Sequence, residues 1–146
     1  MDVTGTYTFA APPQRVWTLL MDPAEIASCI PGCDRLEPDG PDRYKTAITI
    51  GMAAMTGSYE GTVVMSEKVD GTSYRLSVDG QGRAGFVKGD AVITLRADGA
   101  NTVVDVKGTA QTGGMIARLG QRLIASAAKS MQDRFFACMQ DKVVRS

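Results

Sequence analysis

The chain has 146 residues, a length that suits one domain, and its 16 basic residues balance 16 acidic ones. A chain without net charge has no global field to attract nucleic acid, so we expect no nucleic-acid partner. Histidine is absent, which removes Ser-His-Asp triads, Cys-His pairs and HExxH zinc sites from consideration. We predict no catalytic residue and no metal ligand.

The sequence shows no pattern of secretion or membrane spanning. Its longest apolar run, residues 135–139, is far shorter than the ~20 residues that cross a bilayer. Residues 1–5 contain neither a basic nor an apolar signal region. Three cysteines are too few, and odd in number, for a disulfide framework. These features predict a cytoplasmic protein in a reducing compartment.

The first third of the chain predicts one strand and two short helices. Alternation over 4–9 indicates the strand. A helix follows over 13–21, where Pro13 suits the first helical position. Asp22 is a good N-cap for a second short helix over 24–28.

From about residue 34 the hydrophobic period changes to two, which is typical of strands. We predict six more strands, over 34–38, 43–51, 57–68, 72–79, 86–97 and 102–111. Turn dipeptides such as Asp70-Gly71 and Asp98-Gly99 separate the alternating runs. Such short connections leave no room for helical crossovers, so we expect an antiparallel meander.

Residues 115–143 predict one long helix, with apolar residues every three to four positions and no proline. Gly120 lies inside it and costs roughly 1 kcal/mol relative to alanine; we interpret it as allowing close approach to the sheet. The helix spans about 40 Å and alone is long enough to cover the sheet. With no linker in the sequence, we expect one domain over 1–146.

This order predicts an α+β helix-grip fold, in which a seven-stranded curved antiparallel sheet, with two short helices after its first strand, wraps around one long C-terminal helix. We expect sheet and helix to meet at the middle and to diverge toward the ends, leaving an apolar gap that serves as a binding site. The residues predicted to contact a ligand are Trp17, Leu20, Ile30, Met52, Met55, Tyr59, Tyr74, Phe86, Met115, Leu119 and Leu123.

Several segments carry a more specific resemblance. Residues 10–17 (AAPPQRVW), Asp22-Pro23 and residues 29–33 (CIPGC) resemble the opening of the CoxG family, which is named for the G subunit of carbon monoxide dehydrogenase. This family falls in the START-like superfamily, with the polyketide cyclases/dehydrases and lipid-transport proteins. Residues 113–136 are also similar to the family, and the likeness covers essentially the whole chain.

The resemblance implies a non-catalytic accessory protein of a molybdenum-containing CO dehydrogenase or a related hydroxylase. Some family members are described as holding a quinone in the cavity and recruiting the enzyme to the membrane. The implied partners are therefore a small apolar molecule (a quinone or lipid), the hydroxylase subunits and, peripherally, the inner face of the cell membrane. No tightly bound cofactor is implied. Many members continue into a hydrophobic anchor, whereas this sequence ends at Ser146, directly after the predicted helix.

Two other functions stay open. An enzyme of the polyketide cyclase/dehydrase kind needs an acid or base inside the cavity, for which Glu60 and Tyr59 are the candidates. Otherwise Glu60 is expected to face solvent and to pair with an arginine such as Arg75. A ligand-free assembly factor would instead have a filled core and an apolar patch near Ile30 or over 52–55.

Three further features have competing interpretations. A zinc site at Cys29 and Cys33 would need two further ligands from distant parts of the chain. We therefore interpret the two cysteines either as small buried side chains or as partners in a disulfide on oxidation. Residues 80–85 match GxGxxG but precede a strand, so we expect a flexible glycine hairpin over the cavity mouth, not a nucleotide site. Residues 114–146 contain six cations and two carboxylates, forming either a surface for anionic membranes or acidic partners, or a solvated helix face.

Overall fold

Seven strands form one antiparallel sheet in the computed structural model, which describes residues 1–51 and 56–145. Their order across the sheet is β1-β7-β6-β5-β4-β3-β2, so β2 to β7 form a meander and β1 pairs with β7. The predicted meander is confirmed. The strands are β1 (Asp2–Phe9), β2 (Cys33–Pro38), β3 (Arg43–Ile50), β4 (Gly57–Val69), β5 (Ser73–Gly82), β6 (Gly85–Asp98) and β7 (Asn101–Gly113).

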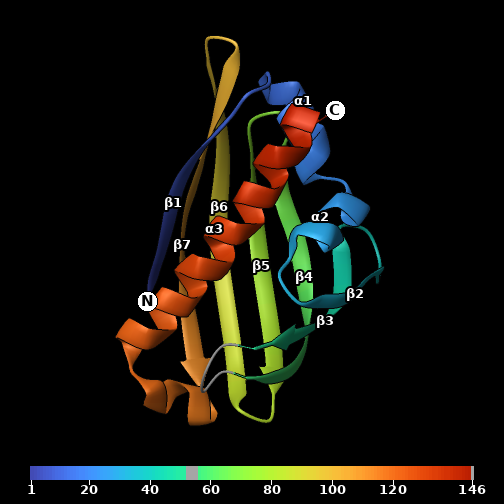
Figure 1. Cartoon of the computed structure of the whole chain (residues 1–146). Helices are drawn as coiled ribbons and strands as arrows, with labels where there is room; N and C mark the ends of the chain where they lie inside the picture. The colour runs from blue at the N-terminus through green and yellow to red at the C-terminus, as the bar shows by residue number, and fades with distance from the viewer. Residues whose placement is uncertain (52–55, 146) are drawn as a thin grey trace.

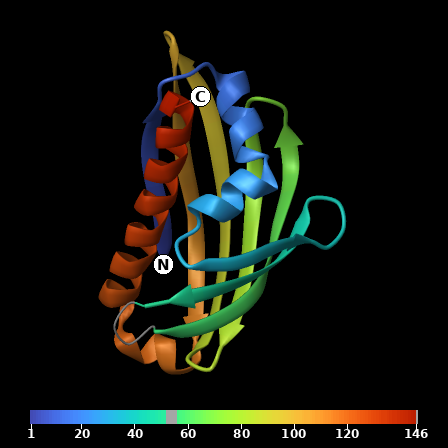
Figure 2. The ribbon, with the colours of Figure 1, turned by 45° about the vertical axis from the view of Figure 1, so that its right-hand side comes forward.

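The helices all lie on one face of the curved sheet (Figures 1 and 2). They are α1 (Pro13–Leu20), α2 (Pro23–Cys29), the short 3-10 helix η2 (Gly114–Leu119) and α3 (Gln121–Arg145). The Asp22 carboxylate accepts hydrogen bonds from the backbone N–H groups of Ala24 and Glu25, so it caps α2 as predicted. The α+β helix-grip class is confirmed, because α3 crosses the face that the sheet curves around.

The single helix predicted over 115–143 is wrong at its beginning. Gly120 separates η2 from α3 with φ 85° and ψ 150°, a backbone conformation that only glycine adopts readily. Among the described residues, no atom beyond its chain neighbours lies within 4 Å of where a Gly120 Cβ would be. The glycine therefore serves a change of chain direction and not close approach to the sheet.

Apolar side chains on the concave face form two clusters. The first lies around α1 and the C-terminal half of α3, and its members include Phe9, Trp17, Met65 and Phe136. The second consists of Tyr59, Ile116, Ile124 and Ala127, from β4, η2 and the start of α3. Since β4 and α3 each contribute to both clusters, sheet and helix are held together at both ends.

Candidate functional site

A cavity of about 330 Å³ lies on the concave face between sheet and helices. On α3 it borders Met131 and Phe135, beyond the Ala127 of the second cluster. On β6 it borders Gly89 and Ala91.

The expected contact at the middle of α3 exists on the edge strand β1, where Gln132 donates to the Thr4 carbonyl and Asp133 accepts from the Tyr7 hydroxyl. The expected separation toward the ends is wrong, because both clusters join α3 to the sheet there.

Gly89 of β6 borders this space and contributes no side chain to it. Alternation along the strand directs residues 89, 91 and 93 toward the helices and Asp90 toward the opposite face. A Cβ on Gly89 would meet only the Thr109 carbonyl oxygen, at 3.9 Å. A side chain at position 89 would therefore begin in open space and extend into the cavity.

Three of the residues predicted to contact a ligand line this cavity: Leu20, Ile30 and Tyr74. Trp17 is buried behind them, with its ring edge-to-face on Tyr74 at a centroid distance of 5.7 Å. Contact of these residues with a ligand stays a prediction.

The other predicted residues lie outside the cavity. Tyr59 and Leu119 belong to the second cluster, while Met115 and Leu123 are 66% and 45% exposed. Phe86 lies on the opposite face of β6 from the cavity, with the Lys88 ammonium 5.9 Å from its ring centroid. Phe86 lies outside because side chains alternate between the two faces of a strand. Met115 and Leu123 are exposed on either side of the turn at Gly120. The predictions at 52 and 55 fall outside the described residues.

Most of the cavity wall comes from residues that the sequence analysis did not select as ligand contacts. They include Ile26, Ile48, Val63, Met65, Met131 and Phe135. A signal for two of them exists in the sequence, because Ala127, Met131 and Phe135 follow at four-residue spacing along one helix stripe. The pattern does not reveal which turn of that stripe faces a hollow part of the sheet.

Tyr74 supplies a buried hydroxyl to a mostly apolar lining; it is 4% exposed. Burial raises its pKa far above the ordinary value of a tyrosine, so the group is neutral. Asp90 also borders the cavity, but its carboxylate lies 2.6 Å from the Arg75 guanidinium and pairs there on the other face.

Glu60, the best acidic candidate for catalysis, lies on the outside of the sheet. Its side chain is 76% exposed and its carboxylate is 3.7 Å from the Arg35 guanidinium. The expected partner, Arg75, instead pairs with Glu67 and Asp90. Tyr59 is buried outside the cavity, and burial raises the pKa of its hydroxyl.

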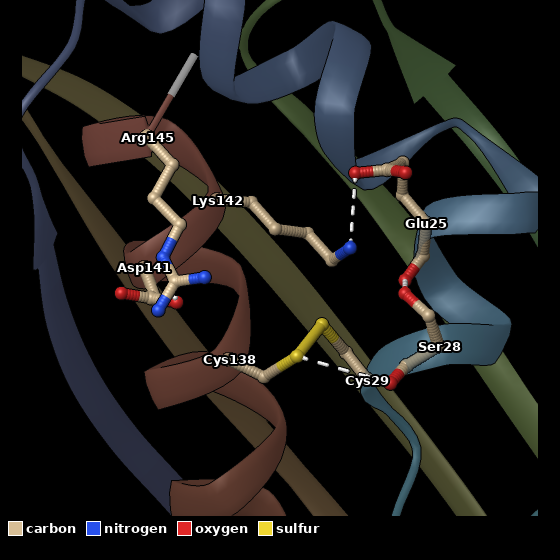
Figure 3. Close-up of a disulfide and its surroundings, with 7 residues drawn as sticks. All are labelled: Glu25, Ser28, Cys29, Cys138, Asp141, Lys142 and Arg145. Atoms are coloured by element: carbon tan, nitrogen blue, oxygen red, sulfur yellow. Dashed lines mark hydrogen bonds and ion pairs between the residues drawn. A yellow bond between two sulfur atoms is a disulfide. The ribbon is translucent and has the colours of Figure 1, made fainter.

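A disulfide joins Cys29 at the end of α2 to Cys138 on α3 (Figure 3), with their Cα atoms 5.5 Å apart. The predicted alternative of a Cys29–Cys33 pair is therefore wrong, because Cys33 is a free thiol whose Sγ donates to the Arg35 carbonyl. The packing of α2 on α3 brings the two paired cysteines together across 109 residues. An ion pair between Lys142 and Glu25, at 3.3 Å, connects the same two helices.

The glycine-rich segment 80–85 is a strand hairpin, as expected, in which Gly82 pairs with Gly85. It does not lie over the cavity. The Ala84 carbonyl accepts a hydrogen bond from the Ile116 N–H at 2.8 Å, and the Ala84 side chain packs on the second cluster. The hairpin therefore holds η2 against the end of the sheet.

Carboxylates neutralise half of the cations in the C-terminal segment. Lys129 pairs with Asp133, Arg145 with Asp141, and Lys142 with Glu25 of α2. None of the helices within 1–51 and 56–145 combines the length and apolar character that crossing a bilayer requires. In the same ranges, no three acidic or cysteine side chains gather as a metal site would need.

The curved antiparallel sheet, the long helix across it and the cavity between them define the START-like class of folds. Two solved structures show the same fold: a START superfamily protein from Mycobacterium smegmatis (TM-score 0.74, 10% identity, covering 99% of this chain and 97% of that one) and a protein from Chromobacterium violaceum (TM-score 0.73, 18% identity, covering 97% and 96%). At these identities the likeness concerns the fold alone.

The family follows from the sequence over nearly the whole chain. The model of the CoxG family, described as the G subunit of carbon monoxide dehydrogenase, matches residues 5–144. A conserved protein from Geobacillus kaustophilus is 33% identical, with a TM-score of 0.97, and the match covers 100% of this chain and 97% of that one. No curated protein matches the chain. The chain belongs to the CoxG family.

Proposed function

We propose that this protein binds a small apolar molecule, a quinone or a lipid, between the sheet and α3. The observation that carries the proposal is the cavity of about 330 Å³ on the concave face, a size found in small-molecule sites. Methionines 65 and 131 in its wall suit apolar ligands of varied shape, because their side chains are unbranched and flexible.

Family membership supports the role of an accessory, non-catalytic protein. The family takes its description from carbon monoxide dehydrogenase, so the proposed protein partner is a molybdenum-containing CO dehydrogenase or a related hydroxylase. Affinity capture of this chain co-expressed with such an enzyme tests the partnership, and failure to retain any part of the enzyme at physiological salt would contradict it.

Location at the inner face of the cell membrane is also part of the proposal. Met115 and Leu123 are exposed near the junction of η2 and α3, where the exposed Arg118 and Arg122 add positive charge. Exposed apolar side chains beside cations suit peripheral contact with anionic lipids. A cytoplasmic protein would reach this surface from inside the cell.

The two other functions have less support. A cyclase or dehydrase needs an acid or base inside the cavity, whereas Glu60 is outside it and the Asp90 carboxylate pairs with Arg75 on the opposite face. A ligand-free assembly factor needs no cavity, so the open space between sheet and helix favours ligand binding.

Native mass spectrometry of the purified chain tests the proposal directly. The chain is titrated with isoprenoid quinones, fatty acids and their esters, and a polar compound of similar mass. We expect saturable one-to-one adducts with at least one apolar class and none with the polar compound. Absence of any apolar adduct would overturn the proposed function.

A matched pair of variants locates the binding site. Gly89→Leu puts a side chain into the cavity, so we expect its adducts to disappear while the protein stays folded. Val92→Leu adds one methylene group on the opposite face of the same strand and should bind like the wild type. Equal binding by both variants would place the ligand elsewhere.

A further inference from the structure

We infer that the Tyr74 hydroxyl is the hydrogen-bond donor that selects neutral, carbonyl-bearing ligands in this cavity, and that ionised carboxylates are excluded. The inference rests on the proposed function, because it names the chemical class that the apolar site accepts. It assigns a specificity-determining role to one side chain.

The first step is that the Tyr74 hydroxyl has an unused hydrogen-bonding capacity. In the described part of the chain, no donor or acceptor pairs with it. The same part of the chain contains no side-chain oxygen or nitrogen that is both sealed from solvent and without a partner. The hydroxyl oxygen must therefore border open space, and the space that Tyr74 lines is the cavity.

The second step is that this hydroxyl is a donor held in place. Burial keeps the phenol protonated, since it raises the pKa of Tyr74 far above the ordinary tyrosine value. The indole of Trp17 packs edge-to-face on the ring, and Tyr74 pairs with Ile93 in the sheet. The hydroxyl hydrogen has no acceptor among the described residues, and a ligand carbonyl oxygen in the cavity would supply one.

The third step is that the other polar side chains on the cavity side are already occupied. The Thr46 hydroxyl donates to the Arg35 carbonyl at 3.0 Å. The Gln132 amide nitrogen donates to the Thr4 carbonyl at 3.0 Å and to the Tyr7 hydroxyl at 2.8 Å. Thr109 also borders the cavity, but it is exposed and pairs in register with Asp90, whose side chain lies on the opposite face of the sheet. Among the side-chain donors of the described lining residues that point to the helices, Tyr74 is therefore the one available to a ligand.

The fourth step concerns charge. None of the described residues that line the cavity is lysine or arginine. An ionised carboxylate would lose its hydration there without gaining a cation, which is strongly unfavourable. A quinone carbonyl or an ester carbonyl has no such charge and needs one donor only. The cavity therefore fits the neutral form of either chemistry.

Two pairs of probes separate these requirements in a binding titration. The first pair is 2,3-dimethyl-1,4-naphthoquinone and 2,3-dimethylnaphthalene, which share a shape and differ in their carbonyl groups. The second pair is methyl decanoate and decanoate, of which only the second is charged at pH 7. Each probe is titrated into the wild type, Tyr74→Phe and the control Tyr44→Phe, a half-buried tyrosine on β3 outside the cavity lining.

We expect Tyr74→Phe to weaken binding of the naphthoquinone or the ester roughly two- to twelvefold, which corresponds to the loss of one hydrogen bond. Its affinity for 2,3-dimethylnaphthalene should not fall. Tyr44→Phe should bind as the wild type does, and decanoate should not bind. Whichever of quinone and ester binds more tightly identifies the source of the carbonyl. Thermal unfolding checks that each variant is folded.

The failures are distinguishable. If the wild type binds the neutral probes but Tyr74→Phe leaves the ratio of quinone to hydrocarbon affinity unchanged, this inference is overturned and the proposed function stands. Tight binding of decanoate would overturn the exclusion of carboxylates. If no apolar probe binds the wild type, the proposed function itself fails. Should Tyr74→Phe unfold, the ratio of decanoate to methyl decanoate affinity in the wild type still tests the charge requirement.

Discussion

A small polar cluster joins β1 to α3 at the surface beside the first core cluster. The Tyr7 hydroxyl donates to an Asp133 carboxylate oxygen at 2.7 Å, and the Lys129 ammonium lies 3.1 Å from the same oxygen. The Tyr7 hydroxyl first, and Lys129 second, hold the pKa of Asp133 below its ordinary value of 3.8. The cluster therefore favours the ionised carboxylate in the folded state.

This shift predicts a pH-dependent contribution to stability. Because the pKa of Asp133 is lower in the folded than in the unfolded chain, its contribution is present above the unfolded value and is lost as the pH falls through the folded value. We expect the wild type to exceed Asp133→Asn in free energy of unfolding above about pH 5 and to match it near about pH 2. Urea unfolding across this range measures the difference, which should be small because the side chain is half exposed.

Tyr7→Phe is the control for this mechanism, because it removes the hydroxyl that donates to Asp133. In the Tyr7→Phe background, Asp133→Asn should produce a smaller pH-dependent difference. A difference between wild type and Asp133→Asn that stays constant from neutral to acid pH would contradict the assignment.

The role of Gly120 at the junction of η2 and α3 can be tested by substitution. If Gly120 lay inside a continuous helix, Gly120→Ala would stabilise the protein by roughly 1 kcal/mol. At its observed φ of 85° and ψ of 150°, an alanine is strained, and we expect a loss of about 1–3 kcal/mol. The sign of the change in free energy of unfolding, measured with urea, decides between them.

A second glycine substitution controls for generic effects of alanine. Gly89 is in a strand, and a Cβ there meets nothing closer than 3.9 Å, so Gly89→Ala should leave stability unchanged or raise it slightly. Stabilisation by Gly120→Ala would show that the chain runs through this position as a continuous helix.

The Cys29–Cys138 disulfide acts on the molecule as a whole, because it closes a loop of 109 residues that contains most of the sheet. It ties α2, which contributes Ile26 to the cavity wall, to α3, which contributes Phe135. Cross-linking so long a loop restricts the unfolded chain, so reduction should cost about 2–4 kcal/mol of stability.

Thiol counting checks the pairing. Under denaturing conditions without reductant, an alkylating agent should modify one cysteine, Cys33, and after reduction it should modify three. The Cys33→Ser variant should show none before reduction and two afterwards. Three modified cysteines in the unreduced wild type, purified without reductant, would contradict the disulfide and agree with the reducing compartment that the cysteine count predicts.

Much of this architecture is determined by local patterns. Two-residue alternation and the turn dipeptides Asp70-Gly71 and Asp98-Gly99 predict the strands and their meander, and the Asp22 cap predicts the beginning of α2. The family follows from segments such as residues 29–33, within the matched range 5–144. These features depend on neighbours in the chain, so they can be predicted without the fold.

The site depended on contacts between distant parts of the chain. Alternation shows that residues 87, 89 and 91 share a face of β6, but only packing against α3 decides that this face is inward and that Phe86 is outward. The cavity arises where Gly89 lies opposite Met131 and Phe135, and the disulfide arises where α2 meets α3. Such proximity is a property of three-dimensional packing, and the spacing of residues along the chain does not contain it.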